Sequence, residues 1–449
     1  SYLIQELRRL FPLLPVQDEE GMALPLREIT EKMGISYLIR GFQGNGEGMD
    51  AAWKELYTWY KKSPKWQSKV ESLLKAGYYR RPMDGLTEAV AKRLYGEEFE
   101  DSITRMERFQ TCAFAHFLTY GLNLQERQEY DFQAVDMGNV CHNALERFSR
   151  KVEREGCGWV GLKEEKRASF IDESVEEAIT DYGNSVLYSS ARNEYMIVRM
   201  KRMLERTVWA LTKQLSAGDF QPSAYEFRFA NGKIDRIDTW DKVYVKVLDY
   251  KTGSKAFDVV ALYHGLQLQL MVYMDAAVKA EQKKHKEQEV IPAGVFYYRI
   301  QDPLVDKQEE ASVEEALLKE LKPDGMINLK DEVLHHLEHR TEGESLAVPV
   351  KFNKNGSLAK SSKAVPEEEF QIMMRHAARK VEETHQSILR GETKASPYRR
   401  GQETGCDYCK YRHVCGFDVK VPGYAYRDIG KMSKEEAIAA MQAASKGEE

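Results

Sequence analysis

The feature that most constrains the fold is a change of hydrophobic period in the middle of the chain. From Asp101 to about residue 216, apolar side chains recur at the spacing of amphipathic helices. Three short segments then alternate polar with β-branched or aromatic side chains, as half-buried strands do: 224–229, 233–238 and 243–248. A helical pattern at about 259–280 and a further strand at 294–300 follow. This order predicts an α/β fold, with a core sheet and helices around it.

Composition and charge exclude several classes of protein. The 449 residues are 42% hydrophobic and 31% charged, which is typical of a soluble globular protein. With 66 Lys and Arg against 71 Asp and Glu there is no overall basic field, although a local basic groove could still hold nucleic acid. No apolar run approaches the ~20 residues of a membrane span. The opening Ser-Tyr-Leu-Ile suggests a fragment of a longer chain rather than a signal peptide.

The six cysteines fall into two groups along the chain. Three lie early, and three lie close together near the end with C-x2-C-x5-C spacing: Cys406, Cys409 and Cys415. So few cysteines cannot make a disulfide framework, whereas the late spacing is typical of metal ligation. Cysteine usage therefore favours a reducing cytoplasm. Of the early group, Cys141 is expected to be a buried thiol of an apolar helix and Cys157 a loop thiol.

Two acidic residues and a lysine carry the strongest chemical signal. Asp235 comes just after the hairpin dipeptide Asn231-Gly232. Asp249 lies on the next strand, with Lys251 two residues later on the same face. Carboxylates held side by side repel each other unless a hard cation such as Mg2+ lies between them. With a lysine beside them, this set suits hydrolysis of a phosphodiester by a metal-bound water. The alternative is a group of ordinary charges at a solvated strand end.

Further side chains could join this set. Glu226 lies one strand earlier and offers another oxygen. Gln269 and Tyr273 are four residues apart on one helix face, where they could hold a phosphate or the lysine. His142 lies on an apolar helix, where a core histidine is the alternative to a ligand. The sequence lacks the G-x-x-x-x-G-K-[ST] loop of P-loop ATPases, so ATP hydrolysis by this chain is not expected.

These residues follow one another in the order His142, Asp235, Asp249-x-Lys251 and Gln269-x-x-x-Tyr273. This order resembles the RecB-like branch of the PD-(D/E)XK nucleases, and more closely the nuclease domain of the AddB family of bacterial helicase-nuclease subunits. Residues 102–122 resemble the opening segment of that domain and 406–418 its closing segment. The resemblance covers about 100–420 and implies a PD-(D/E)XK core sheet with helices around it.

The resemblance also implies a division of the chain. Residues 1–100, mainly helix and loop, would end a helicase-like portion, 101–425 would form the nuclease domain, and 426–449 would be a C-terminal helix and tail. The alternatives within the nucleases are a stand-alone or a CRISPR-associated RecB-like enzyme. The first 100 residues and the helical insert at 150–216 favour the AddB family, because compact relatives would have little use for them.

Roles for individual residues follow from the same resemblance. Mg2+ would take its ligands from acidic side chains, an imidazole and a backbone carbonyl: His142, Asp235, Asp249, Tyr250 and, as a possible addition, Glu226. Lys251 would assist the attacking water. Gln269 and Tyr273 would orient the substrate or Lys251.

Four cysteines would hold a [4Fe-4S] cluster that staples the two ends of the nuclease domain: Cys112, Cys406, Cys409 and Cys415. Spacing alone leaves zinc and an iron-sulfur cluster equally open, because four thiolates bind either. A clip across so long a loop removes much freedom from the unfolded chain. A structural role is therefore expected rather than redox work.

The implied activity is a Mg2+-dependent DNA exonuclease that resects double-strand breaks for recombinational repair, acting on the 5'-terminated strand. Its partners would be DNA, as double-strand ends and single strands, and an AddA-like helicase-nuclease subunit in a heterodimer. A function of another class is a non-catalytic scaffold that binds DNA and a partner. The complete set of Asp235, Asp249 and Lys251 argues against that scaffold, because loss of one would disable the chemistry.

Two further patterns have competing interpretations. His335-His-Leu-Glu338-His339 contains the inverted zinc-protease motif H-x-x-E-H, but histidines at the end of a helix are favoured by its dipole alone. A metalloprotease is therefore not favoured. Basic residues near the late cysteines could contact DNA phosphates or form a solvated rim: Arg399, Arg400, Lys410 and Arg412.

Overall fold

The computed structural model describes residues 2–14, 30–43, 51–77, 85–96, 102–127, 132–188, 190–306, 310–421 and 423–446. The chain divides into two compact units, Ser1–Pro82 and Met83–Glu449. The predicted division into a helicase-like portion up to residue 100, a nuclease domain up to residue 425 and a C-terminal tail concerns what each part does, and it stays a prediction. None of the helices in these ranges is both long and apolar enough to cross a membrane.

The first unit is helical in its described parts. Its helices are α1 (Tyr2–Leu10), α2 (Glu31–Gln43), α3 (Ala51–Lys62) and α4 (Gln67–Gly77). The last three share a small core in which Leu38, Tyr60 and Val70 are buried. The predicted helical N-terminal segment is confirmed.

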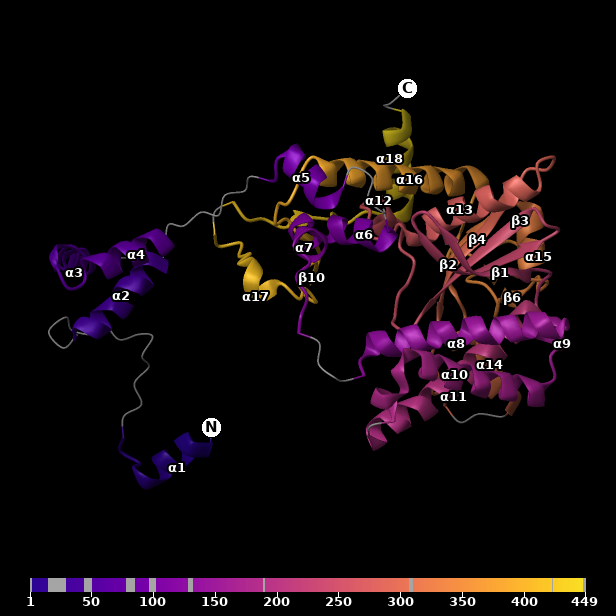
Figure 1. Ribbon diagram of the computed structural model, residues 1–449, viewed down its shortest axis with the longest axis horizontal. Helices are drawn as coiled ribbons and strands as arrows, with labels where there is room; N and C mark the ends of the chain where they lie inside the picture. The colour runs from indigo at the N-terminus through magenta and orange to yellow at the C-terminus, as the bar shows by residue number, and fades with distance from the viewer. Residues whose placement is uncertain are drawn as a thin grey trace. The chain divides into compact units, whose positions relative to one another are not determined.

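A mixed sheet forms the centre of the second unit (Figure 1). Within the described residues it has six strands, in the order β1-β2-β3-β4-β5-β8. They are β1 (Gln221–Phe229), β2 (Gly232–Trp240), β3 (Tyr244–Lys251), β4 (Ile291–Arg299), β5 (Asp324–Asn328) and β8 (Ala364–Val365). β1 to β3 are antiparallel neighbours, whereas β3 and β4 run parallel. The predicted α/β fold, with three strands, helix and a further strand, is confirmed.

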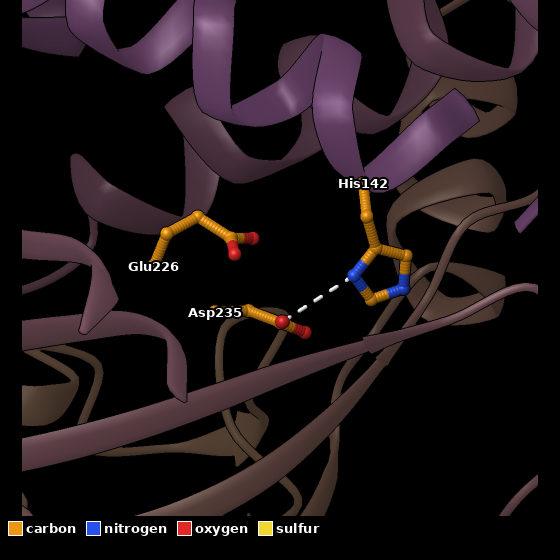
Figure 2. Close-up of side chains that lie close together, drawn as sticks. All are labelled: His142, Glu226 and Asp235. Atoms are coloured by element: carbon orange, nitrogen blue, oxygen red, sulfur yellow. Dashed lines mark ion pairs between the residues drawn. The ribbon is translucent and has the colours of Figure 1, made fainter. Parts of the chain in front are cut away.

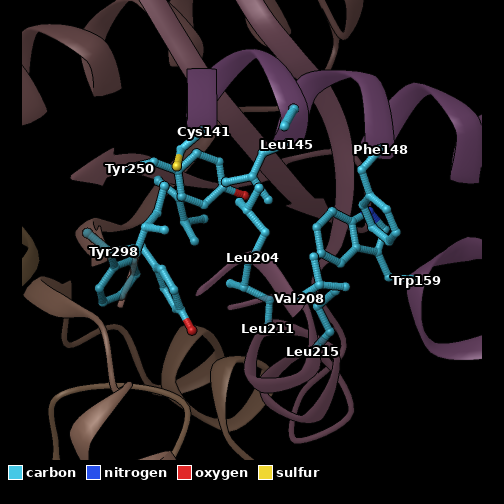
Figure 3. Close-up of a cluster of buried hydrophobic side chains, with 14 of the residues drawn as sticks. Cys141, Leu145, Phe148, Trp159, Leu204, Val208, Leu211, Leu215, Tyr250 and Tyr298 are labelled. Atoms are coloured by element: carbon cyan, nitrogen blue, oxygen red, sulfur yellow. The ribbon is translucent and has the colours of Figure 1, made fainter. Parts of the chain in front are cut away.

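Three long helices cover one face of this sheet: α8 (Ala134–Glu155), α10 (Glu164–Leu187) and α11 (Ala191–Leu215). Leu145 of α8 and Leu204 of α11 are buried in one cluster with Tyr250 of β3 and Tyr298 of β4 (Figure 3). Burial of large apolar side chains contributes about 1.5–3 kcal/mol each, so this cluster fixes α8 against the strands. Cys141 is one of its buried members, as expected for a thiol of an apolar helix, and Cys157 is exposed.

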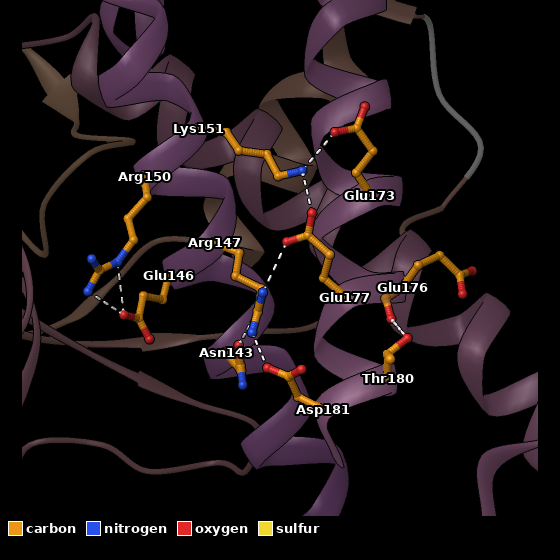
Figure 4. Close-up of polar contacts among 10 residues, drawn as sticks. All are labelled: Asn143, Glu146, Arg147, Arg150, Lys151, Glu173, Glu176, Glu177, Thr180 and Asp181. Atoms are coloured by element: carbon orange, nitrogen blue, oxygen red, sulfur yellow. Dashed lines mark hydrogen bonds and ion pairs between the residues drawn. The ribbon is translucent and has the colours of Figure 1, made fainter. Parts of the chain in front are cut away.

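Ion pairs add to the contact between α8 and α10 on the solvent side (Figure 4). Lys151 bridges Glu173 and Glu177 at 2.7 and 2.9 Å, and Arg147 pairs with Glu177 at 3.1 Å. The acidic partners are about half exposed, and such surface pairs contribute roughly 0–1 kcal/mol each. The apolar cluster therefore dominates the packing of these helices, and the charges mainly fix their register.

Four helices lie on the other face: α6 (Ile103–Thr111), α13 (Gln269–Lys284), α16 (Glu367–Leu389) and α18 (Lys434–Lys446). Val245 and Val247 of β3 are buried in the cluster on this side, whereas Leu248 and Tyr250 belong to the opposite cluster. Because side chains alternate along a strand, Asp249 continues the series of the two valines. The sheet thus directs Asp249 toward α13.

The predicted helix at 259–280 is broken in two. α12 (Val259–Tyr263) ends before Gly265, which has a φ of +73°, and α13 begins at Gln269. A left-handed backbone at Gly265 costs little because glycine has no Cβ, so the chain turns here. The break makes Gln269 the first residue of α13.

The remaining elements are short. Helical ones are α5 (Glu88–Tyr95), α7 (Ala113–His116), η3 (Phe117–Gly121), α9 (Gly158–Gly161), α14 (Glu310–Glu320), α15 (Asp331–Leu337) and α17 (Arg412–Cys415). The short strands are β6 (Gly343–Glu344), β7 (Lys351–Phe352), β9 (Tyr398–Arg400), β10 (Glu403–Thr404) and β11 (Arg427–Asp428).

Candidate active site

Three ligand-type side chains converge where α8 meets β1 and β2 (Figure 2). His142, Glu226 and Asp235 each offer an atom that lies within 4.8 Å of the other two, which is close enough to share one metal ion. His142 Nδ1 is 3.3 Å from Asp235 Oδ1. The other oxygen of Asp235 accepts a 2.7 Å hydrogen bond from the backbone N–H of Tyr250, so this carboxylate is held from two sides.

The environment of His142 favours its charged form. Burial alone would lower the pKa of this imidazole, but the hydrogen bond to Asp235 and the negative charges of Asp235 and Asp249 raise it above its ordinary value. A site that raises the pKa of a histidine carries excess negative charge. Such a site attracts cations.

Glu226 reaches this group through an unusual backbone conformation. Its φ is +50° within β1, a left-handed value that is uncommon outside glycine. Its carboxylate is 7% exposed and forms an ion pair with Lys233 on β2. Burial raises the pKa of Glu226. Glu226 was predicted as a possible ligand, whereas Lys233, which neutralises it across the hairpin, was not predicted.

Asp249 lies beside this group at the end of β3. The register that pairs Arg236 with Leu248 brings Asp235 opposite Asp249. Asp249 is almost fully buried, and its burial, together with the negative charge of Asp235, raises its pKa to about 6. Two carboxylates on adjacent strands thus repel each other, as the sequence predicted. A divalent cation between them would remove that repulsion.

The partners of Asp249 come from β3 and α13. Lys251 forms an ion pair with Asp249 Oδ2. Gln269 donates through Nε2 to Asp249 Oδ1 at 2.9 Å and also lies 2.9 Å from the hydroxyl of Tyr273. All the acidic and basic side chains predicted for the site therefore lie together. Tyr250 contributes its N–H to Asp235, while the role predicted for its carbonyl stays a prediction.

Glu107 is a second contributor that was not predicted. Glu107 on α6 accepts hydrogen bonds through Oε1 from the N–H groups of Leu268 and Gln269, at 2.8 and 3.0 Å. Its other oxygen lies 3.7 Å from Lys255 Nζ. The amphipathic pattern of α6 identifies its apolar face only, so it gives no signal for this contact.

The four cysteines of the predicted cluster come together from both ends of the second unit. Cys112, Cys406, Cys409 and Cys415 line one cavity of about 170 Å³. Burial, together with repulsion from the other three thiolates, raises the pKa of Cys406 to about 11. Four sulfur donors around one cavity fit a metal centre with four thiolate ligands.

The H-x-x-E-H segment does not form a ligand group. His336 pairs with Asp219 at 2.6 Å and stacks on Trp240. Glu338 is buried and accepts a 2.6 Å hydrogen bond from Ser345. In the part of the chain that the structure describes, His142, Glu226 and Asp235 are the three potential ligands whose atoms all lie within 4.8 Å of one another; the four cysteines share a cavity but no three of them are that close. The metalloprotease alternative therefore gains no support.

The basic residues near the C-terminal cysteines mostly form ion pairs with other residues of the chain. Arg399 pairs with Asp428 and Arg400 with Asp258, both at 2.6 Å. Lys410 lies 3.2 Å from Glu126, and both of these side chains are well exposed. Two alternatives were predicted for these basic residues, contact with DNA phosphates and a solvated rim. Because of the internal ion pairs, Arg399 and Arg400 have less charge available for DNA phosphates than Lys410 has. Arg412 lines the cysteine cavity.

An open groove adjoins the site. Its volume is about 970 Å³, and its lining includes Glu107 and Leu266 near α13, Asp136 at the start of α8, and Tyr408 and Lys410 from the cysteine segment. The groove therefore borders the site through Glu107, which contacts Gln269, and through the first turn of α8, the helix that carries His142 farther along.

Comparison with known proteins gives a family. The family model of the PD-(D/E)XK nuclease superfamily matches residues 101–416, and the model of the ATP-dependent helicase/deoxyribonuclease AddB fifth domain matches residues 30–76. A protein from Lachnoclostridium phytofermentans, named as a subunit of an ATP-dependent helicase/deoxyribonuclease, is 38% identical over 97% of this chain and 40% of its own length. One of the same name from Alkaliphilus metalliredigens is 32% identical over 98% of this chain and 41% of its own length.

The chain thus spans about two fifths of the length of these relatives. The similarity to the AddB family, expected from the sequence, is confirmed, as is the expectation of a nuclease domain. Because the matching nuclease model covers most of the second unit, the chain belongs to the PD-(D/E)XK nuclease superfamily.

Proposed function

We propose that this chain is the nuclease part of a helicase-nuclease subunit and that it hydrolyses DNA phosphodiesters with Mg2+. The observation that carries the proposal is the approach of two buried carboxylates, Asp235 and Asp249, with the ammonium group of Lys251 on one of them. Ordinary charges at a solvated strand end would not be buried together. This burial argues against that alternative.

Asp235 and Asp249 would hold the Mg2+, with His142 and the carbonyl of Tyr250 completing the donor set and Glu226 as a further oxygen. These are mainly the hard oxygen donors that Mg2+ prefers. The bound ion would supply Lewis acidity toward the phosphate and a water of lowered pKa.

The other side chains would act on the reacting groups or on the ligands. Lys251 is about one quarter exposed, so its ammonium group can reach a phosphate while it stays beside Asp249. There it would orient the attacking water and stabilise the negative charge that develops on the phosphate. Gln269 would fix the orientation of Asp249, and Tyr273 that of Gln269.

For the cysteine centre we propose a [4Fe-4S] cluster that joins the two ends of the domain. A single zinc ion lies about 2.3 Å from each of four sulfurs, which leaves no free volume between them. No three of the four cysteine sulfurs, which all belong to the described residues, lie within 4.8 Å of one another, and the cavity of about 170 Å³ that they line together with other side chains suits a larger group. Its role would be structural, because it links α6 to the C-terminal segment.

The groove beside the site would hold single-stranded DNA. Tyr408 is 98% exposed and Tyr120 is 37% exposed at its wall, and exposed aromatic rings stack on bases without sequence preference. Arg127 and Lys410 also line the groove and would attract the phosphates. Stacking on exposed rings requires unpaired bases, so these tyrosines support binding of single-stranded rather than double-stranded DNA.

The wider setting is proposed from the relatives. Their name, which describes one subunit of an ATP-dependent helicase/deoxyribonuclease, suggests an AddA-like partner in a heterodimer. We propose resection of double-strand breaks in a bacterial cytoplasm, on the 5'-terminated strand. The match at residues 30–76 favours this setting over a stand-alone or CRISPR-associated nuclease. Cleavage of single-stranded DNA by this chain in the presence of Mg2+ would distinguish the proposed nuclease from a non-catalytic scaffold.

Replacing Lys251 with Ala should separate chemistry from metal binding. Because an ammonium group is no metal ligand, Mg2+ affinity measured by calorimetry should stay close to wild type. Loss of one positioned charge-stabilising donor should lower the rate of single-stranded DNA cleavage on the order of 10²- to 10³-fold. Lys279→Ala is the matched control, since Lys279 forms its ion pair with Asp275 on α13 rather than with an acidic residue of the metal set. Equal rates for the two variants would refute the role of Lys251.

A further inference from the structure

Helix α6 contacts the active site and the cysteine centre through adjacent residues. Glu107 accepts the N–H groups of Leu268 and Gln269, while Arg108 Nη2 lies 3.9 Å from the sulfur of Cys409. The helix ends at Thr111, and Cys112 follows directly. One rigid element of nine residues therefore spans the two sites.

Glu107 acts as a cap supplied from outside α13. The first N–H groups of a helix have no partner within it, and a negative charge at that end is favourable to the helix dipole. Leu268, the residue before α13, has no side-chain oxygen and makes no side-chain cap hydrogen bond. The carboxylate of Glu107, which is only 17% exposed, takes that place.

The capped residue is one that touches the catalytic carboxylate. The backbone N–H of Gln269 donates a hydrogen bond to Glu107, and its side chain donates a 2.9 Å hydrogen bond to Asp249. A shift of the first turn of α13 would therefore break or lengthen the bond to Asp249. Since geometric errors near 1 Å can cost on the order of 10²-fold in rate, the cap is placed to affect catalysis.

We propose that Glu107 is a positioning residue, which holds Gln269 and through it Asp249, and that it makes this geometry depend on the cysteine end of α6. The inference rests on the proposed nuclease site. It assigns to the cysteine centre an effect on the active site that goes beyond joining two chain ends.

The position of α6 itself does not depend on Glu107. Ile103, Met106 and Phe109 are buried on its apolar face, and this packing holds the helix without any contribution from Glu107. Removal of the Glu107 carboxylate should thus leave α6 in place and free only the start of α13. This makes the effect separable from unfolding.

Three variants test the proposal by kinetics. In Glu107→Ala, kcat for single-stranded DNA at saturating Mg2+ should fall on the order of 10- to 100-fold with KM nearly unchanged. Glu107→Gln should restore most of the rate, because its carboxamide oxygen can accept both N–H groups. Gln110→Ala, on the same helix but bonded to α16, should keep the wild-type rate.

Hydrogen exchange gives a second readout that does not depend on activity. The amides of Leu268 and Gln269 should exchange faster in Glu107→Ala than in the wild type, with iron content unchanged. They should also exchange faster in Cys112→Ala or, if that variant does not fold, in Cys415→Ser. Protection retained in these cysteine variants would overturn the link to the cysteine centre.

The outcomes distinguish this inference from the proposed function. A wild-type kcat and protected amides in Glu107→Ala, while Asp249→Ala is inactive, would overturn the positioning role alone. An equal loss of kcat in Gln110→Ala would also overturn it, because the effect would then be a general loosening of α6. Full activity of Asp249→Ala would instead contradict the nuclease site itself.

Discussion

Replacement of Asp249 by Ala should abolish Mg2+-dependent cleavage of DNA. The change removes a negative charge and a coordination position from a buried site, so several kcal/mol of transition-state stabilisation should be lost. Calorimetric titration should show Mg2+ binding lost together with cleavage. DNA binding by the variant should change little, because phosphates are held mainly by basic groups elsewhere.

The matched control is Asp275→Ala. Asp275 lies on α13 and is about one third exposed, and its ion pair is with Lys279 at 2.6 Å rather than with a residue of the site. The Asp275→Ala variant should cleave DNA at the wild-type rate. Wild-type cleavage by Asp249→Ala, in a preparation free of other nucleases, would defeat the assignment. If cleavage then stopped in His335→Ala, the H-x-x-E-H segment would be the true site.

Replacement of Cys112 by Ala should remove most of the bound iron and sulfide and loosen the second unit. Cys112 would be the ligand contributed by the N-terminal side of the chain, and the other three cysteines of the cavity lie near the C-terminal end. In the chain-entropy model, a link that closes a loop of 100 residues contributes about 4.7 kcal/mol, and the loop closed here is longer. Iron and sulfide analysis, the melting temperature and protease resistance measure the effect.

Cys157→Ala provides the comparison for this experiment. Cys157 is exposed and does not line the cysteine cavity, so its replacement should change neither iron content nor melting temperature. Unchanged iron and protease resistance in Cys112→Ala would contradict the staple. Loss of zinc rather than iron would keep the staple and correct its chemistry.

The sheet and the acidic pair could be predicted because their determinants are local. Alternation over 243–248 marks β3, and a two-residue step from Asp249 to Lys251 fixes their common face. The tight turn at Asp241 and Lys242, where both residues have a positive φ, sets the register between β2 and β3 that places Asp235 opposite Asp249. No longer-range information was needed to bring the two carboxylates near each other.

Other parts of the site depend on contacts that no local pattern records. The break between α12 and α13 combines a left-handed glycine with a cap from Glu107, which lies far earlier in the chain. A single helix over 259–280 was therefore predicted where two exist. The left-handed backbone of Glu226 and its pairing with Lys233 likewise follow from the packed hairpin.

The most direct test of the metal-dependent nuclease site is an anomalous diffraction map from crystals of the protein grown with Mn2+ in place of Mg2+. We predict a peak between β2 and β3, with carboxylate oxygens of both Asp235 and Asp249 at roughly 2.1 Å, close to the distance for Mg2+. The same crystals of Asp249→Ala should lack it. A peak elsewhere, with none at these two carboxylates in a protein that cleaves DNA, would contradict the proposed metal site.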